Sequence, residues 1–228
     1  MHILYEDNHL IIVNKQAGDI VQGDKTGDAP LSDIIKDFIK VRDKKPGNVF
    51  LGVVHRLDRP VSGVCLFAKT SKALARMNAL FAKHEEVRKT YWAIVGNRPP
   101  KPEGTLVHWL TRDEKRNMAR AYEREVPNSK RAHLDYRTLC HSDRYWLLEV
   151  TLHTGRHHQI RCQLSKIGCP IKGDLKYGAP RSNPDGSISL HARRLDFIHP
   201  VTQKEIAVEA PVPNDKLWQT MEKQENPL

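Results

Sequence analysis

Cysteines are few in this sequence and long apolar runs are missing, and each shortage excludes a class of protein. The four cysteines form no CxxC pair and no dense framework, which argues against a disulfide scaffold and fits a reducing compartment. No stretch approaches the ~20 apolar residues of a membrane-spanning helix. The N-terminus, MHILYEDNHLIIVNK, has acidic residues where a signal peptide has basic ones. The sequence therefore predicts a cytoplasmic protein without a membrane segment.

Acidic residues are also too few to balance the basic ones. The 228 residues include 37 lysines and arginines against 27 aspartates and glutamates, which gives a formal net charge of +10 at pH 7. A basic surface attracts polyanions, so nucleic acid is the first partner to consider. The charge alone also fits a soluble basic protein without such a partner. Sequence motifs are needed to distinguish the two.

The sequence does contain both helical and strand periodicities. Residues 31–39 and 71–81 place their apolar side chains on one face of a helix, and a short helix with Leu217, Trp218 and Met221 ends the chain. The alternation typical of half-buried strands is found in residues 2–5, 10–13, 91–95, 132–137, 146–153 and 206–210. We therefore expect an α/β fold of the α+β type, with a large mixed, mainly antiparallel sheet and a few helices.

The length of the chain suits one domain that spans residues 1–228. A Pro-rich turn, GNRPPKPEG at residues 96–104, is the candidate seam if this domain has two lobes. Residues 112–131 have dense mixed charge and little apolar content. They predict a long excursion from the sheet that grips the substrate, although a solvated loop with no role fits the composition equally well.

The most unusual segment is VVHRLDRPVSGVCLFAKTS, residues 53–71, in which Asp58 stands near Arg56 and beside Arg59. Cationic neighbours favour the ionised carboxylate, which is the form that a nucleophile or a base requires. A surface ion pair in a loop accounts for the same pattern.

A second segment, LHTGRHHQIRCQLSKIG at residues 152–168, reads as the end of a strand followed by a helix. On such a helix His157 and Arg161 share a face, and the helix N-terminus attracts phosphate. A buried histidine and a surface arginine explain the spacing as well. In a third segment, KTYWAIV, Tyr91 lies on a strand, where an aromatic residue usually belongs to the core.

In this order, these segments resemble the RluA-type pseudouridine synthases. The resemblance covers nearly the whole chain and includes ILYEDNHLIIVNK, HRLDRPVSG, FAKTSKA, KTYWAIV, TGRHHQIRCQL, GCPIKGDLKYG and LHARRLDFIHP. Motifs of this length in a fixed order are highly specific. The resemblance implies the catalytic domain alone, without the small N-terminal RNA-binding domain of some members.

The resemblance also implies a role for each matching residue. Asp58 matches the catalytic aspartate, Tyr91 the active-site tyrosine, and Arg161 the arginine that pairs with the aspartate. Arg56 matches an arginine that helps to hold a flipped-out nucleotide. The further RNA contacts expected are Arg59, Arg156 and His157.

Two positions depart from the family pattern, and both bear on the subfamily and not on the activity. Val61 stands where the family usually has threonine, and Gln16 where it usually has proline.

The function implied is that of an isomerase which converts uridines in ribosomal or transfer RNA to pseudouridine, with no metal, no cofactor and no protein partner, as a monomer. One alternative is a non-catalytic RNA-binding module of the same fold. Another is a metal-dependent hydrolase, whose candidate residues are His55, Asp58, His157, His158 and His191. No second carboxylate accompanies the His157–His158 pair, which disfavours the hydrolase.

Overall fold

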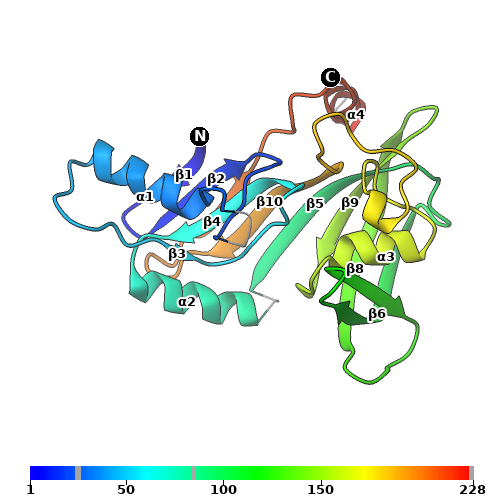
Figure 1. Ribbon diagram of the computed structural model, residues 1–228, viewed down its shortest axis with the longest axis horizontal. Helices are drawn as coiled ribbons and strands as arrows, with labels where there is room; N and C mark the ends of the chain where they lie inside the picture. The colour runs from blue at the N-terminus through cyan, green and yellow to red at the C-terminus, as the bar shows by residue number, and fades with distance from the viewer. Residues whose placement is uncertain (24–26, 84–85, 226–228) are drawn as a thin grey trace. The chain divides into compact units, whose positions relative to one another are not determined.

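The computed structural model describes residues 1–23, 27–83 and 86–225, and the chain divides into two compact units (Figure 1). The first unit comprises Met1–Val87 and Arg194–Pro211, and the second comprises Arg88–Arg193 and Val212–Leu228. The chain passes from one unit to the other within strands β5 (Val87–Val95) and β10 (Leu190–Ile198) and again after Pro211.

The first unit is built on strands in the order β1-β2-β4-β10, with β3 paired to β4 and β11 paired to β10. Its elements are β1 (His2–Glu6), β2 (Leu10–Lys15), α1 (Leu31–Arg42), β3 (Gly52–Val53), β4 (Ser62–Ala68), α2 (Ser71–Ala82) and β11 (Glu205–Glu209). Successive residues of a strand point to opposite faces, and every residue of β4 is buried, so both faces of this strand are covered. Figure 1 shows α1 and α2 on opposite sides of these strands.

Helix α2 begins where its sequence predicts. The Oγ1 atom of Thr70 accepts a hydrogen bond from the backbone N–H of Ala73 at 3.1 Å, which is the usual cap of a helix N-terminus. The buried side chains of Ala73 and Met77 then pack into a core cluster that includes Leu10 of β2 and Leu66 of β4.

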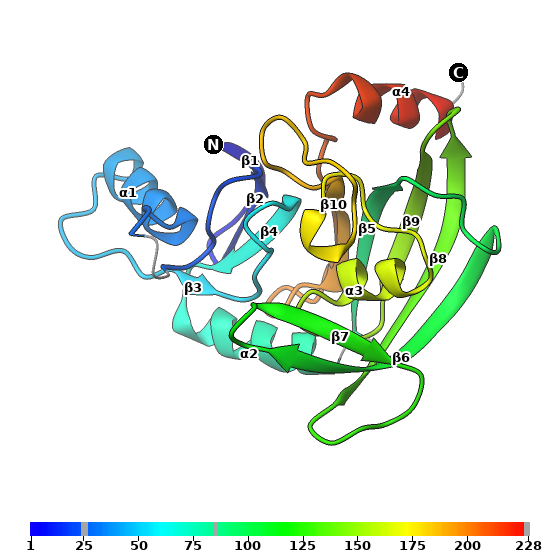
Figure 2. The same cartoon turned by 45° about the vertical axis from the view of Figure 1, so that its right-hand side comes forward.

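The second unit holds a sheet in the order β5-β9-β8-β6-β7, and each neighbouring pair is antiparallel. Its elements are β5, β6 (Glu103–Asp113), β7 (Met118–Tyr122), β8 (Lys130–His141), β9 (Trp146–Leu152), α3 (Gln159–Lys166), the 3-10 helix η1 (Leu175–Tyr177) and α4 (Lys216–Glu225). Helix α3 packs near β6 and β7, where Cys162 joins a cluster with Leu110 and Ala119 (Figure 2). Helix α4 packs Trp218 and Met221 on Ile94 and Leu147.

The predicted fold class is confirmed, because the described residues form a mixed α/β structure with a large, mostly antiparallel sheet and four α-helices. Within those residues, none of the helices combines the length and the apolar character needed to cross a membrane. The division into one domain with a seam at residues 96–104 stays a prediction.

The expectation for residues 112–131 was wrong in part, because they do not form one long loop. Strand β7 folds back on β6 in a hairpin, with Leu110 opposite Ala121 and Asp113 opposite Met118. Only Ala119 of β7 is buried, and it packs below α3. Four of the five residues of β7, MARAY, are apolar or aromatic, so apolar and polar residues do not alternate along it, which is why the sequence does not reveal this strand.

Candidate active site

Asp58 lies in the loop that joins β3 to β4, here called the Asp58 loop (residues 54–61). Its side chain is half-buried, whereas Arg56 and Arg59 are exposed and Leu57 is buried. The backbone carbonyl of Asp58 accepts a hydrogen bond from the N–H of Val61 at 3.0 Å, which closes a turn. The loop therefore carries a half-buried carboxylate between two arginines in the sequence whose side chains are exposed.

Lys15 holds the Asp58 loop in place through hydrogen bonds to its backbone. Its side chain is fully buried, and its Nζ donates hydrogen bonds to the backbone carbonyls of Gln16 at 2.9 Å, Arg59 at 3.1 Å and Val61 at 2.7 Å. Burial lowers the pKa of Lys15 to about 8, against the opposing charges of Asp19 and other groups that include Asp58. A buried lysine is rare unless it is paired, so its place here indicates an anchor for the Asp58 loop.

The anchor gives a testable prediction. Replacing Lys15 with methionine keeps the length of the side chain but removes its hydrogen bonds to the three carbonyls, of which that of Arg59 also accepts from the N–H of Gly18 at 2.9 Å. Because the bond to the Val61 carbonyl is buried, and a buried polar group that loses its hydrogen bond costs about 1–3 kcal/mol, we expect the Asp58 loop to shift and turnover to fall at least ~10-fold. RNA affinity, measured by filter binding, is expected to change less than ~3-fold, because Lys15 is buried and cannot contact phosphate.

Lys36→Met is the matched control, because Lys36 is an exposed lysine on α1 that pairs with the neighbouring Asp33. Equal turnover in Lys15→Met and Lys36→Met would contradict the anchoring role.

The activity of the wild type is also expected to decline as the pH rises through about 8, because the Lys15 amine then loses its charge and has two protons for three acceptors.

Tyr91 lies on β5 in the second unit, opposite Val150 of β9. Its side chain is 9% exposed, so most of the ring is packed against the protein. Alternation along β5 places Tyr91 on the face of the sheet opposite to Thr90 and Trp92. The face that carries Tyr91 is also the face of Val150 and, on β8, of Leu134.

The turn before α3 differs from the expectation that His157 and Arg161 share a helical face. Helix α3 begins only at Gln159, because His158 has a left-handed backbone with φ 51° and occupies the N-cap. His157 therefore lies in the turn, with its ring stacked on that of His158 at 3.8 Å between centroids.

Gln159 holds this turn together, a role that no spacing in the sequence predicts. Its Oε1 accepts hydrogen bonds from Thr154 Oγ1 at 2.8 Å and from the N–H of Arg156 at 3.0 Å, and its Nε2 donates to the carbonyl of His133 at 3.1 Å. Arg156 is half-buried, and its Nε donates to the carbonyl of Arg131 at 3.0 Å. The turn is thus held by side-chain hydrogen bonds to the backbone of two other segments.

Arg161 is buried, so it is not the surface arginine that the spacing of His157 and Arg161 also allowed. Its side chain is 6% exposed, and its guanidinium binds both carboxylate oxygens of Asp174, with Nε–Oδ2 at 2.7 Å and Nη2–Oδ1 at 2.9 Å. Asp174 is 1% exposed and comes from the GDLKYG motif, to which spacing alone assigned no role. The pairing of Arg161 with Asp58 stays a prediction.

Tyr177 completes the surroundings of Arg161. The guanidinium lies 5.1 Å from the centre of the Tyr177 ring, a cation–π distance. The Tyr177 hydroxyl accepts a hydrogen bond from the N–H of Ala119 at 2.7 Å and lies 2.9 Å from Nδ1 of His158. Burial raises the pKa of Tyr177, so the hydroxyl keeps its proton.

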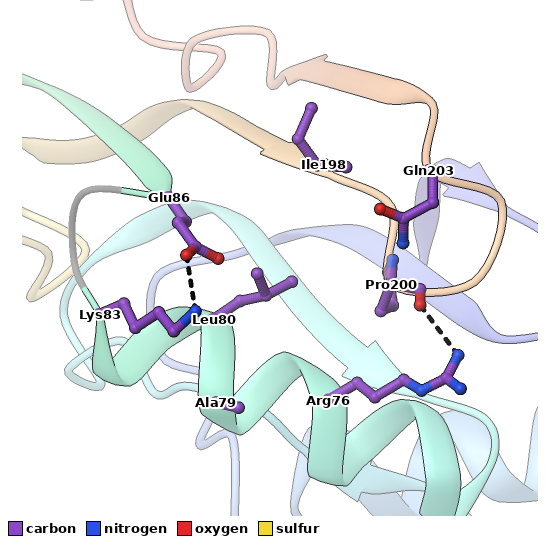
Figure 3. Close-up of a pocket in the computed structure, with 8 residues that line it drawn as sticks. All are labelled: Arg76, Ala79, Leu80, Lys83, Glu86, Ile198, Pro200 and Gln203. Atoms are coloured by element: carbon purple, nitrogen blue, oxygen red, sulfur yellow. Dashed lines mark hydrogen bonds and ion pairs between the residues drawn. The ribbon is translucent and has the colours of Figure 1, made fainter.

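A groove of about 570 Å³ lies elsewhere on the first unit, between α2 and the loop after β10 (Figure 3). Its two cations are engaged, because Arg76 donates to the carbonyl of Pro200 at 2.9 Å and Lys83 pairs with Glu86 at 2.8 Å. The predicted site residues, all of which the structure describes, lie outside the lining of this groove.

The predicted residues thus fall into two groups. Arg56, Asp58 and Arg59 share the Asp58 loop of the first unit, whereas the second unit holds Tyr91, Arg156, His157 and Arg161. Comparison with protein families bears on what the two groups do. The family model described as RNA pseudouridylate synthase matches residues 9–166. The chain belongs to this family.

Two curated relatives show how far the likeness to other pseudouridine synthases extends. The chain is 32% identical to an uncharacterized RNA pseudouridine synthase, YjbO, of Bacillus subtilis, over 94% of this chain and 74% of the relative. It is 31% identical to tRNA pseudouridine synthase C of Vibrio cholerae, over 96% and 93%.

A third relative and a solved structure agree with them. The chain is 32% identical to ribosomal large subunit pseudouridine synthase D of Zymomonas mobilis, over 94% of this chain and 70% of the relative. The solved structure of human RNA pseudouridylate synthase domain containing 4 matches with a TM-score of 0.79 at 24% identity, over 98% of this chain and 92% of that one, which shows the shared fold.

The predicted resemblance to RluA-type synthases is confirmed at the level of this family, and with it the prediction of an RNA-modifying isomerase. These relatives are synthases by name, and none of them favours the non-catalytic RNA-binding module. The roles of the individual site residues, the cytoplasmic location and the monomeric state stay predictions.

Proposed function

We propose that this pseudouridine synthase isomerises specific uridines in ribosomal or transfer RNA, with Asp58 as its nucleophile. The observation that carries the proposal is the Asp58 loop, in which a buried lysine holds the backbone at two residues that directly follow a half-buried carboxylate. Both RNA classes are named among the relatives, at 31% and 32% identity, so the likeness does not choose between them.

The reaction needs one bond broken and one bond formed. The bond between the ribose C1′ and the uracil N1 breaks, the uracil rotates, and a bond between C1′ and C5 takes its place. The proton on C5 is lost and N1 gains one, so the reaction is redox-neutral. A stacked uridine is out of reach, and extruding it costs about a few kcal/mol, which the RNA contacts must supply.

In the proposed mechanism the Asp58 carboxylate attacks either C6 of the ring or C1′ of the sugar. Arg161 pairs with this carboxylate and aims it at the substrate, because a guanidinium binds a carboxylate through directional, charge-assisted hydrogen bonds. Tyr91 stacks on the flipped base, as aromatic side chains do in single-stranded RNA recognition. A tyrosine in that position could also take the C5 proton before the product leaves.

RNA contacts are assigned to exposed cations on both units. Arg56 and Arg59 flank Asp58, and Arg156 lies in the turn before α3 with His157. The β6–β7 hairpin adds four exposed cations, which are Arg112, Lys115, Arg116 and Arg120. Lysine and arginine that neutralise phosphates make affinity fall as salt rises, so the hairpin is the proposed grip on the RNA backbone.

Tritium release tests the reaction. RNA labelled at uracil C5 is prepared from a strain that lacks this protein, and the transfer and ribosomal fractions are assayed separately. Wild-type protein is expected to release tritium from one fraction and not from the other. Binding of both fractions without release from either would contradict the proposal and favour the RNA-binding module.

A further inference from the structure

A cluster of two histidines and one aspartate lies on the sheet of the second unit, and the proposed chemistry uses none of their side chains. His133 and Asp135 belong to β8, and His153 follows directly after β9. Residues two apart on a strand point to the same face. Leu134 pairs with Leu152, so His133 lies opposite His153, and their rings stack at 4.2 Å between centroids.

The ligating atoms of this cluster converge on one point. Nε2 of His153 lies 2.6 Å from Oδ2 of Asp135, and Nε2 of His133 lies 3.9 Å from Oδ1 of the same carboxylate. One ligand atom from each residue lies within 4.8 Å of the others. Ligand atoms at ~2.0–2.1 Å from a tetrahedral Zn²⁺ are about 3.3 Å apart, so small side-chain rotations bring these atoms to that spacing.

Chemistry and access both suit a metal ion. Two imidazoles and one carboxylate are a frequent ligand set for divalent transition metals, and three protein ligands leave a position for water. The side chains of His133, Asp135 and His153 are 26%, 46% and 40% exposed, and Asp135 lines a groove of about 340 Å³ with Thr105 and Thr151. Solvent and ions can therefore reach the carboxylate.

A hydrogen bond from a residue outside the cluster orients its carboxylate. Thr105 Oγ1 donates a hydrogen bond to Oδ1 of Asp135 at 2.6 Å, which orients the carboxylate as second-sphere partners of metal ligands do.

We propose that His133, Asp135 and His153 form a binding site for a divalent transition-metal ion of the zinc class. The ion would join β8 to the segment after β9, which leads into the turn held by Gln159. It would lie on the face of the sheet that carries Thr151 and Thr90, and Tyr91 points to the other face. The site is thus distinct from the proposed chemistry, and its loss leaves pseudouridine formation unchanged.

Calorimetric titration of the full chain with Zn²⁺ tests the site. One ion per chain is expected, with a Kd in the micromolar range or tighter. Asp135→Asn and His153→Gln are each expected to weaken binding at least ~10-fold, because losing a ligand costs at least as much as losing its second-sphere partner. His141→Gln is the matched control, since His141 is an exposed histidine at the far end of β8.

Co²⁺ absorption separates this site from one built on cysteines, since thiolate ligands add strong charge-transfer bands in the near ultraviolet. Bands typical of nitrogen and oxygen ligands that disappear in His153→Gln support the proposal. It is overturned if the wild type does not bind Zn²⁺, or if His153→Gln binds as tightly as His141→Gln. Circular dichroism of the metal-free variants ensures that a lost site is not an unfolded protein, and tritium release shows whether the synthase activity is retained.

Discussion

Replacing Asp58 with asparagine is expected to reduce turnover by at least ~10³-fold, because an amide cannot act as the nucleophile that the proposed mechanism requires. The substitution keeps the volume of the side chain and leaves the turn between Asp58 and Val61, which uses backbone atoms, in place. RNA affinity is expected to stay within ~3-fold, since the exposed cations around the loop are unchanged. Single-turnover tritium release and filter binding at one fixed salt concentration measure the two effects.

Asp28→Asn is the matched control for this experiment. Asp28 pairs with Arg59 at 2.7 Å and is 53% exposed, so the variant removes a carboxylate close to the Asp58 loop that has no part in the proposed chemistry. Its turnover is expected to stay close to that of the wild type. If Asp58→Asn modified RNA at the normal rate, the assignment of the nucleophile would be wrong. If both variants lost activity equally, the effect would be one of local charge.

Local sequence was sufficient to predict the elements that carry strong periodicity. The strands at residues 91–95 and 146–153 and the helix from Ser71 alternate or repeat clearly, and each is found at or near its expected position. The start of α3 could not be predicted in the same way. It depends on the left-handed backbone of His158 and on Gln159, whose side chain bonds to three other residues of the unit.

The same distinction applies to the candidate site. Asp58 stands out because it has cationic neighbours in the sequence, whereas Lys15 lies 44 residues before Arg59 and resembles the last polar residue of an apolar strand. Asp174 is 13 residues beyond Arg161 and follows a glycine in a loop. Neither partner can be found from spacing, since a loop of any length can bring two residues together at small entropic cost.

Breaking the buried pair of Arg161 and Asp174 is expected to have the largest effect on stability. Asp174→Ala leaves a guanidinium that is 6% exposed without its carboxylate, and such a loss costs about 3–5 kcal/mol in the free energy of unfolding. Urea denaturation of the variant and the wild type measures the difference. Asp33→Ala is the control, because it breaks an exposed pair with Lys36 that is worth at most about 1 kcal/mol.

A double variant separates the structural role of Arg161 from its proposed catalytic role. Arg161→Met combined with Asp174→Leu replaces the ion pair with apolar side chains of similar size, and such exchanges are often neutral or stabilising. Stability is therefore expected to recover relative to Asp174→Ala. Turnover is not expected to recover, because the double variant lacks the guanidinium that the proposed mechanism pairs with Asp58. A stable double variant with normal turnover would limit Arg161 to holding Asp174, and the cation that supports Asp58 would have to be sought elsewhere.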